Sequence, residues 1–244
     1  MSNRIVIVPT YNELDNINQI IDAVFSLPVP FDMLVVDDNS PDGTADQVKM
    51  KQQQYSGLHL LSRKGKNGLG TAYIEGFKWC IQRQYEYIFE MDADFSHNPN
   101  DLIKLYEGCT AHEGMTVGSR YVTGVNVVNW PMSRVMLSFF ASKYVRFITG
   151  LNIHDTTAGF VCYHRKVLET INLDKIRFKG YAFQIEMKFT AWKHGFQVTE
   201  VPIIFTDRTR GQSKISKGII KEAVWGVITM KIKSLFKTYK QISK

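Results

Sequence analysis

Four short apolar runs, each followed by a polar cluster, constrain the fold of this chain more than any other feature. The runs are Arg4–Pro9, Met33–Val36, Leu58–Leu61 and Tyr87–Met91. Continuous apolar runs are typical of buried parallel strands, and helical spacing of apolar residues follows the first of them, up to Pro28. This alternation predicts an α/β protein with a doubly wound, mostly parallel sheet. The carboxyl ends of parallel strands meet at one edge, so we expect all four polar clusters there.

The fourth run leads into two aspartates one residue apart, Asp92 and Asp94. If the strand continues through them, both side chains point to one side, because side chains alternate with period two. Two carboxylates that close repel each other unless a cation lies between them. Hard oxygen ligands favour Mg²⁺ or Mn²⁺, which would also take oxygens from a diphosphate. The alternative is that the aspartates only cap a helix that begins near Pro99.

The clusters after the second and third runs also permit two interpretations. Residues 37–44 contain turn-forming Asp, Asn, Ser, Pro and Gly, but the doubled Asp37-Asp38 exceeds what a turn requires. Lys66-Asn67-Gly68-Leu69-Gly70 is either a plain glycine-rich loop or one whose N–H groups approach a phosphate at a helix N-terminus. It matches neither the P-loop nor the dinucleotide-binding pattern, so it does not support an NTPase or a dehydrogenase.

Composition limits the class of protein and of partner. A chain of 244 residues with 44% hydrophobic and 22% charged residues is long enough for a sizeable core. A net charge of +7 suggests an anionic partner, whether a phosphate ligand, a membrane surface or nucleic acid. Cys80, Cys109 and Cys162 are too few for a disulfide framework and indicate a reducing compartment. The first strand leaves no room for a signal peptide, and no run approaches the ~18–20 apolar residues of a membrane span. We therefore expect a cytoplasmic protein.

Further candidates for ligand contacts lie downstream. Residues 115–121 predict a strand with Arg120 at its end, and a surface arginine is the alternative. Residues 130–138 open a strongly apolar helix that runs to Gly150. Arg134 and Ser138 lie at i and i+4 of that helix, hence on one face, where each could hold a phosphate oxygen. Otherwise Ser138 is an ordinary helix serine.

The last third of the chain ends in basic segments. A predicted strand at 201–205 leads into a basic loop with Arg208, Arg210 and Lys214, which could close over a diphosphate. From residue 215 to 244, apolar residues at helical spacing interleave with lysines, against a single acid, Glu222. Such a basic amphipathic helix can lie on an anionic membrane surface. The alternative is a helix whose apolar face packs on the core.

Four motifs, in order, resemble the polyprenyl-phosphate (dolichol-phosphate) mannosyltransferases, which are family 2 inverting glycosyltransferases of the GT-A fold. They are Val8–Glu13, Val36–Thr44, Gly68–Tyr73 and Asp92–Asp94. The resemblance implies a single Rossmann-like GT-A domain over residues 1–214. The residues themselves predict an interfacial helical segment over 215–244 and no transmembrane domain, although many relatives carry transmembrane helices after the catalytic domain. The resemblance also implies transfer of mannose from GDP-mannose to a polyprenyl or dolichyl phosphate, with Mg²⁺ or Mn²⁺, by a peripheral enzyme on the cytoplasmic face of a membrane.

The same resemblance assigns roles to individual residues. The nucleoside pocket would be lined by Pro9, Tyr11, Glu13, Val36 and Asp38, while the metal and diphosphate would be held by Asp92, Ala93 and Asp94. Ser96 stands where archaeal and eukaryotic relatives often place Gln as a further metal ligand. Arg120 would bind the sugar-phosphate and, with Arg134 and Ser138, the acceptor phosphate. Arg208 and Lys214 match the cationic positions of an R-x-x-G-x-S-K pattern. Asp94, Arg120, Arg134, Ser138 and Arg208 would therefore be the catalytic residues.

Three later residues, Asp155, Gln184 and Glu186, would be sugar-hydroxyl partners or else buried polar groups that serve only the fold. A phosphate monoester has a second pKa near 6, so it is mostly ionised at neutral pH and needs no strong general base. Direct displacement would invert the α-linked donor to a β-mannosyl phosphate.

Three alternatives are kept open. The first is glucosyl transfer from UDP-glucose to the same lipid. The second is a nucleotide-binding or nucleic-acid-binding protein without transfer activity, although aromatic stacking platforms and a basic stripe are absent from the motif loops, which argues against nucleic acid. The third is a nucleotidyltransferase, whose glycine-rich loop should follow the first strand, where Tyr11-Asn12-Glu13 stands instead.

Overall fold

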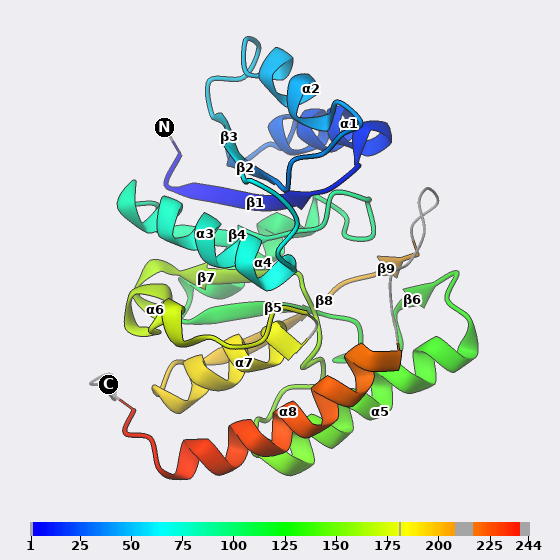
Figure 1. Ribbon diagram of the computed structural model, residues 1–244, viewed down its shortest axis with the longest axis vertical. Helices are drawn as coiled ribbons and strands as arrows, with labels where there is room; N and C mark the ends of the chain where they lie inside the picture. Colours follow the sequence, from blue (N-terminus) through cyan, green and yellow to red (C-terminus); the bar gives the residue numbers. More distant parts are fainter. Residues whose placement is uncertain (1, 181, 208–216, 240–244) are drawn as a thin grey trace.

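A seven-stranded sheet forms the centre of the molecule (Figure 1). The computed structural model describes residues 2–180, 182–207 and 217–239. The strand order is β3-β2-β1-β4-β7-β5-β8. The bounds are β1 (Arg4–Thr10), β2 (Asp32–Asp37), β3 (Leu58–Ser62), β4 (Tyr87–Glu90), β5 (Met115–Ser119), β7 (Val161–His164) and β8 (Val198–Pro202). β7 runs antiparallel to β4 and β5, and the other neighbouring pairs are parallel. The predicted α/β fold with a mostly parallel sheet is confirmed.

Helices cover both faces of this sheet. The longer ones are α1 (Leu14–Phe25), α2 (Thr44–Lys51), α3 (Leu69–Gln82), α4 (Asp101–Thr110), α5 (Met132–Thr149), α7 (Ala182–Lys193) and α8 (Lys217–Leu235), with the shorter α6 (Arg165–Thr170) and η1 (Leu173–Lys175) between them. Alternate residues of β1 enter two separate cores: Ile5 and Ile7 pack with α3 and α7, whereas Val6 and Val8 pack with α1 and α4. This is the doubly wound arrangement, because strand side chains alternate between faces.

Two strands differ from the sequence-based expectation. The strand predicted at 201–205 is divided: β8 ends at Pro202, and β9 (Phe205–Thr206) pairs instead with β6 (Val127–Val128) in a small second sheet. Proline lacks the N–H that a continued ladder would need, which explains the end of β8. The antiparallel β7 was not anticipated, because its run of four residues carries no signal of direction.

Helices α5 and α8 lie side by side at one end of the molecule (Figure 1). The Tyr144 hydroxyl donates to the Val224 carbonyl at 2.9 Å, and the Lys231 Nζ donates to the Thr149 carbonyl at 3.0 Å. Among residues 2–180, 182–207 and 217–239, no helix has the length and apolarity needed to span a membrane. Cys80, Cys109 and Cys162 are free and buried.

Candidate active site

The chain turns sharply after three adjacent strands at one edge of the sheet. Asn12 after β1, Asn39 after β2 and Phe95 after β4 have φ angles of 58°, 59° and 59°. Asparagine tolerates this left-handed conformation, but phenylalanine rarely adopts it. Unfavourable backbone conformations of this kind cluster at ligand sites, where the surrounding structure maintains them. Left-handed backbone conformations therefore occur at the edge where the polar clusters were predicted to meet.

The residues predicted to line a nucleoside pocket lie together at the ends of β1 and β2. Thr10 and Asp37 are paired in the strand register, and the Thr10 hydroxyl donates to Asp37 Oδ1 at 2.9 Å. Asp37 also accepts hydrogen bonds from the backbone N–H and hydroxyl of Ser40, so this aspartate holds the loop. Beside it, Lys66 Nζ lies 4.6 Å from the centre of the Tyr11 ring.

Asp38 forms a buried ion pair with Arg63, a residue that the sequence did not single out. Burial raises the pKa of Asp38, and the nearby Arg63 opposes that rise. Arg63 also donates to Glu75 Oε1 and to the Thr71 hydroxyl, which ties the end of β3 to α3. The one available signal was the position of Arg63 directly after the third apolar run.

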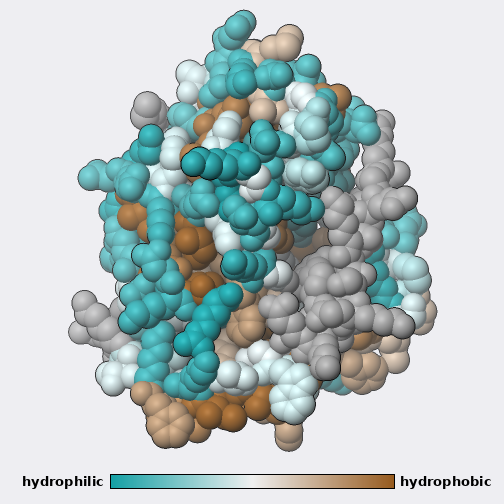
Figure 2. All heavy atoms as spheres, viewed as in Figure 1, coloured by the Kyte–Doolittle hydropathy of each residue, from teal (hydrophilic) through white to brown (hydrophobic). Residues whose placement is uncertain are grey.

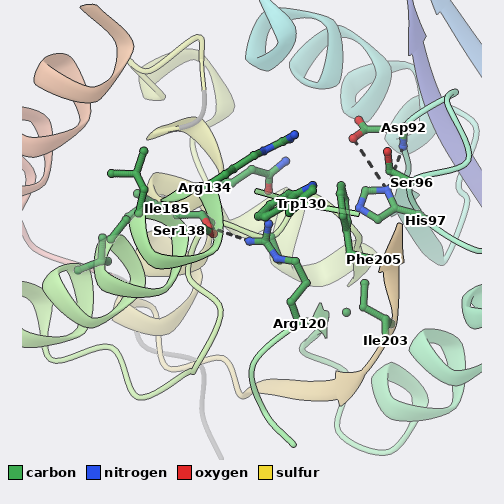
Figure 3. Close-up of a pocket in the computed structure, with 18 of the residues that line it drawn as sticks. Asp92, Ser96, His97, Arg120, Trp130, Arg134, Ser138, Ile185, Ile203 and Phe205 are labelled. Atoms are coloured by element: carbon green, nitrogen blue, oxygen red, sulfur yellow. Dashed lines mark hydrogen bonds and ion pairs between the residues drawn. The ribbon is translucent and has the colours of Figure 1, made fainter. Parts of the chain in front are cut away.

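Asp92 and Asp94 follow β4, but the strand does not continue through them, so the condition for strand alternation to orient both side chains is not met. β4 ends at Glu90, and residues 93–97 form a bend. Asp94 is buried and its Oδ1 accepts from the backbone N–H of Ser96 at 3.0 Å. The Asp92 side chain is 39% exposed and lies at the cavity described below (Figure 3). The loop conformation, and not strand alternation, sets the geometry of the pair.

The donors near Asp92 fit a divalent cation that shares its shell with a ligand. Asp92, Asp94 and Ser96 offer hard oxygens, the ligands of Mg²⁺ and Mn²⁺. In the described part of the chain, no three His, Cys, Asp or Glu side chains gather into a metal site. Burial lowers the pKa of His97 to about 4, so its imidazole is neutral at neutral pH. The residues thus suit an ion held by one or two carboxylates plus phosphate oxygens, not one enclosed by protein ligands.

A cavity of about 370 Å³ extends from Asp92 into the space between α5, α7 and α8 (Figure 3). Its two ends differ in chemistry. The polar end is lined by Asp92, Ser96, His97, Arg120, Arg134 and Asp207. The other end is lined mainly by apolar side chains, namely Leu137, Phe140, Ala141, Val145, Ile185, Val224 and Val227. The cavity therefore suits a ligand with a charged head and an apolar tail.

Arg120 is fixed at the polar end by a buried carboxylate. Its Nε and Nη2 donate to the two oxygens of Asp155 at 2.7 and 2.6 Å, and its backbone N–H donates to the same side chain at 3.0 Å. Burial favours a raised pKa for Asp155, but the Arg120 charge and hydrogen bonds outweigh it and hold that pKa below its usual value. Asp155 is fully buried and engaged with Arg120, so it orients this cation.

Arg134 and Ser138 line the same cavity from one face of α5, as their spacing predicts. Arg134 Nη1 lies 3.0 Å from Asp207 Oδ1, and its guanidinium is 4.0 Å from the centre of the Trp130 ring. The Arg120 guanidinium is 5.4 Å from that ring, so Trp130 contacts both cations. Arg208, Arg210 and Lys214 lie outside the described residues.

The remaining two candidates occupy different environments. Gln184 lines the cavity. Glu186 accepts hydrogen bonds from the backbone N–H groups of Arg177 and Phe178 at 2.8 and 3.0 Å, so its carboxylate holds the segment before α7. Burial raises the pKa of Glu186 despite these hydrogen bonds.

Comparison with known proteins gives consistent matches. Residues 5–171 match the family described as glycosyl transferase family 2. The polyprenol monophosphomannose synthase of Mycolicibacterium smegmatis is 45% identical over 231 residues, which cover 91% of this chain and 86% of the relative. The undecaprenyl-phosphate mannosyltransferase of Micrococcus luteus is 43% identical over 228 residues, covering 91% and 93%.

Solved structures share the fold at low identity. Glucosyl-3-phosphoglycerate synthase from Mycobacterium tuberculosis, with Mn²⁺, UDP-glucose and glycerol 3-phosphate, aligns with a TM-score of 0.65 at 15% identity, covering 96% of this chain and 80% of that one. A mannosyltransferase from Pyrobaculum calidifontis, with GDP-mannose and Mn²⁺, aligns with a TM-score of 0.57 at 17% identity, covering 96% and 74%.

Proposed function

The chain belongs to glycosyl transferase family 2 and is a glycosyltransferase, and on that premise we propose that it moves mannose from GDP-mannose to a polyprenyl phosphate. The names of the two bacterial relatives support mannose and a polyprenyl phosphate acceptor. The observation that carries the proposal is the cavity, whose polar end holds two arginines and whose other end is apolar. An acceptor with a phosphate head and an isoprenoid tail matches both ends, whereas a soluble acceptor has no use for the apolar end.

A divalent metal, Mg²⁺ or Mn²⁺, would be held by Asp92 and Asp94, with Ser96 adjacent. Solved structures of the same fold contain Mn²⁺ together with a nucleotide sugar. Bound there, the ion would neutralise charge on the leaving diphosphate. Arg208 and Lys214 would assist, and Pro9, Tyr11, Glu13, Val36, Asp38 and Ala93 would bind the rest of the nucleotide.

The acceptor phosphate would be gripped by Arg120, Arg134 and Ser138. Asp155 fixes Arg120, and Arg134 and Ser138 share one face of α5. Holding the acceptor in line with the leaving group is catalysis by orientation. A phosphate oxygen attacks the anomeric carbon as its bond to the diphosphate breaks, and GDP leaves with the electron pair. The acceptor is already ionised, so none of the described carboxylates has to serve as a base. The product is a polyprenyl β-mannosyl phosphate.

The tail of such an acceptor lies in a bilayer, so we propose that the protein binds peripherally to an anionic membrane, on its cytoplasmic face. Apolar side chains gather along the edge formed by α5 and α8 (Figure 2). We define this α5–α8 surface by its exposed residues Met132, Phe140, Phe147, Trp225, Ile232, Leu235 and Phe236. Exposed apolar side chains that gather along one edge in this way support a docking site there. The net charge of +7 favours an anionic membrane.

The test is a mass-spectrometric screen of GDP-mannose and UDP-glucose against a polyprenyl phosphate, with Mg²⁺ or Mn²⁺. We expect a mannosyl phosphate product from GDP-mannose. The matching polyprenol without its phosphate serves as the control and should not react. If only UDP-glucose gives product, the donor is UDP-glucose and not GDP-mannose. If the polyprenol reacts as well as its phosphate, the phosphate-binding roles of Arg120 and Arg134 are refuted.

A further inference from the structure

We infer that the Tyr73 hydroxyl and the Gln184 amide donate hydrogen bonds to oxygens of the donor sugar, and that two buried residues, Glu90 and Lys188, hold the Gln184 amide in position. This inference rests on the proposed function and adds residues to it. Tyr73 and Gln184 line the cavity that Asp92 lines, whereas Glu90 and Lys188 lie behind its wall.

Tyr73 carries a buried hydroxyl that has no hydrogen-bond partner within the described part of the chain. The residue is fully buried on α3, and its ring stacks on that of Phe183, with centres 6.0 Å apart and planes 5° apart. Among the residues that the structure describes, nothing hydrogen-bonds its hydroxyl. Burial, together with the charges of Asp92 and Glu90, raises the pKa of Tyr73, so the hydroxyl keeps its proton and is a donor. A buried donor without an acceptor costs free energy, and a ligand in the cavity would remove that cost.

Gln184 presents its amide in one fixed orientation. Its Nε2 donates to Glu90 Oε2 at 2.7 Å, and its Oε1 accepts from Lys188 Nζ at 3.3 Å. An amide nitrogen carries two N–H groups, so one remains for a ligand. Gly159 also lines the cavity, and a Cβ added there would lie 3.7 Å from Nε2. Glycine at this position leaves the amide nitrogen approachable.

Glu90 and Lys188 are ionisable side chains that core packing does not require. Both are fully buried, and Lys188 Nζ also donates to the carbonyls of Ala158 at 2.6 Å and Gln184 at 3.2 Å. Buried ionisable side chains seldom add stability over apolar residues, so a role in fixing geometry explains them better. Because neither lines the cavity, both act through Gln184.

The class of ligand follows from these donors. A tyrosine hydroxyl and an amide N–H are neutral donors, which suit the oxygens of a hydroxylated ring more than a diphosphate. The diphosphate would instead be neutralised by the divalent ion proposed at Asp92 and Asp94, of which Asp92 lines the same cavity. A hexose joined to that diphosphate would therefore meet Tyr73 and Gln184.

The first test is Tyr73→Phe, which removes only the hydroxyl. We expect kcat/KM for GDP-mannose to fall ten- to a hundredfold, while the affinity for GDP, measured by calorimetry, stays within twofold. The unfolding midpoint should not fall, because the lost hydroxyl makes no hydrogen bond to any residue that the structure describes. Tyr85→Phe is the matched control: its hydroxyl donates to Asp32 at 2.6 Å, at the start of β2. That variant should lose stability and keep its kcat/KM.

A second test uses GDP-mannose donors that each lack one hydroxyl. One of them should be used equally by the wild type and by Tyr73→Phe, because the partner of the tyrosine is already missing. For the positioning residues, Lys188→Met should lower kcat/KM, because Gln184 Oε1 loses its donor. Glu90→Gln in the double variant should restore part of that loss, because an amide oxygen still accepts from Gln184 Nε2 and needs no cation beside it.

Three results would overturn the inference. If Tyr73→Phe transfers mannose as well as the wild type, the hydroxyl does not contact the sugar. If Tyr73→Phe lowers the affinity for GDP and for GDP-mannose equally, the hydroxyl binds the diphosphate and not the sugar. If the wild type transfers no sugar from any nucleotide sugar to the polyprenyl phosphate, the proposed function falls and the inference falls with it. If the wild type transfers mannose and Tyr73→Phe does so equally well, the inference is refuted but the proposed function stands.

Discussion

The two cavity arginines are held by carboxylates of different exposure, and this difference separates their roles. Asp155, the partner of Arg120, is fully buried, whereas the Asp207 side chain, the partner of Arg134, is 24% exposed. The first pair is a fixed element of the site. The second pair lies near the surface, where ion pairs contribute about 0–1 kcal/mol, so an acceptor phosphate can compete with Asp207 for Arg134.

Arg134→Ala should therefore impair the use of polyprenyl phosphate more than the binding of the nucleotide sugar. We expect the KM for the acceptor to rise at least about tenfold, and the affinity for GDP-mannose to change by less than about twofold. Arg146→Ala is the control on the same helix, since Arg146 contacts Asn152 and does not line the cavity. Equal losses for donor and acceptor would place Arg134 in the donor site.

Asp94→Asn and Asp92→Asn should each lower transfer at least about a hundredfold, which corresponds to ~2.7 kcal/mol. An amide keeps the shape of the side chain but removes the charge that attracts the cation. Chelation of the wild type should have the same effect, and Mn²⁺ titration should show weakened binding in both variants. Asp46→Asn, at an exposed ion pair on α2, controls for loss of charge. Full transfer in excess chelator would contradict the metal assignment.

At the level of elements, the site is built where loops after several strands meet. Asp155 belongs to the loop before β7, and Arg120 directly follows β5, so their pair joins segments 35 positions apart. Breaking a buried pair leaves an uncompensated charge and costs about 3–5 kcal/mol. The pair thus ties the architecture of the cavity to the stability of the fold.

Asp155→Asn should lower the free energy of unfolding at pH 7 by about 3 kcal/mol. The folded pKa of Asp155 lies below its usual value, so its contribution is fully present above the unfolded pKa of ~3.9 and is lost as the pH falls through the folded pKa. The difference between wild type and variant should therefore shrink below about pH 4. Chemical denaturation at several pH values measures it, and a difference independent of pH would contradict the assignment.

Local pattern was enough to predict most elements, because apolar runs and helical spacing are properties of neighbouring residues. It placed Arg134 and Ser138 on one face of a helix, and Asp92 after a strand. It could not give the direction of β7, the end of β4 at Glu90 or the pairing of Asp38 with Arg63, because these depend on contacts between distant segments. The lone hydroxyl of Tyr73 was equally hidden, since a tyrosine at helical spacing is indistinguishable from an ordinary core residue.

For the whole molecule, the cavity and the α5–α8 surface share the same helices. Leu137 and Phe140 of α5 and Val224 of α8 are exposed to a degree and also line the cavity. A lipid acceptor could therefore enter from a membrane without its tail crossing water. The α8 helix was predicted to be the membrane anchor, and the structure places α5 beside it, so both helices have to be tested.

The final prediction concerns that docking. Phe147 on α5 and Phe236 after α8 are 86% and 87% exposed, so neither supports the core. We expect the double variant Phe147→Ser and Phe236→Ser to keep its unfolding midpoint and to bind anionic vesicles at least about tenfold more weakly, because burial of each side chain is worth ~1.5–3 kcal/mol. Met50→Ser, on α2, is the control, since Met50 is exposed outside this surface. Truncation after Met230 is a less clean test, because it also removes the contact of Lys231 with Thr149.

Varying the salt concentration separates the electrostatic contribution to membrane binding from the apolar one. Attraction of lysines to anionic lipid is worth about 1 kcal/mol each and is screened beyond roughly 8 Å at physiological salt, whereas apolar burial is not screened. Wild-type binding, measured by vesicle sedimentation, should therefore weaken but persist at high salt, while the double serine variant should be released. If the variant sediments like the wild type at both salt concentrations, the α5–α8 surface is not the membrane contact. The lipid acceptor would then have to enter the apolar end of the cavity from solution instead of from the membrane.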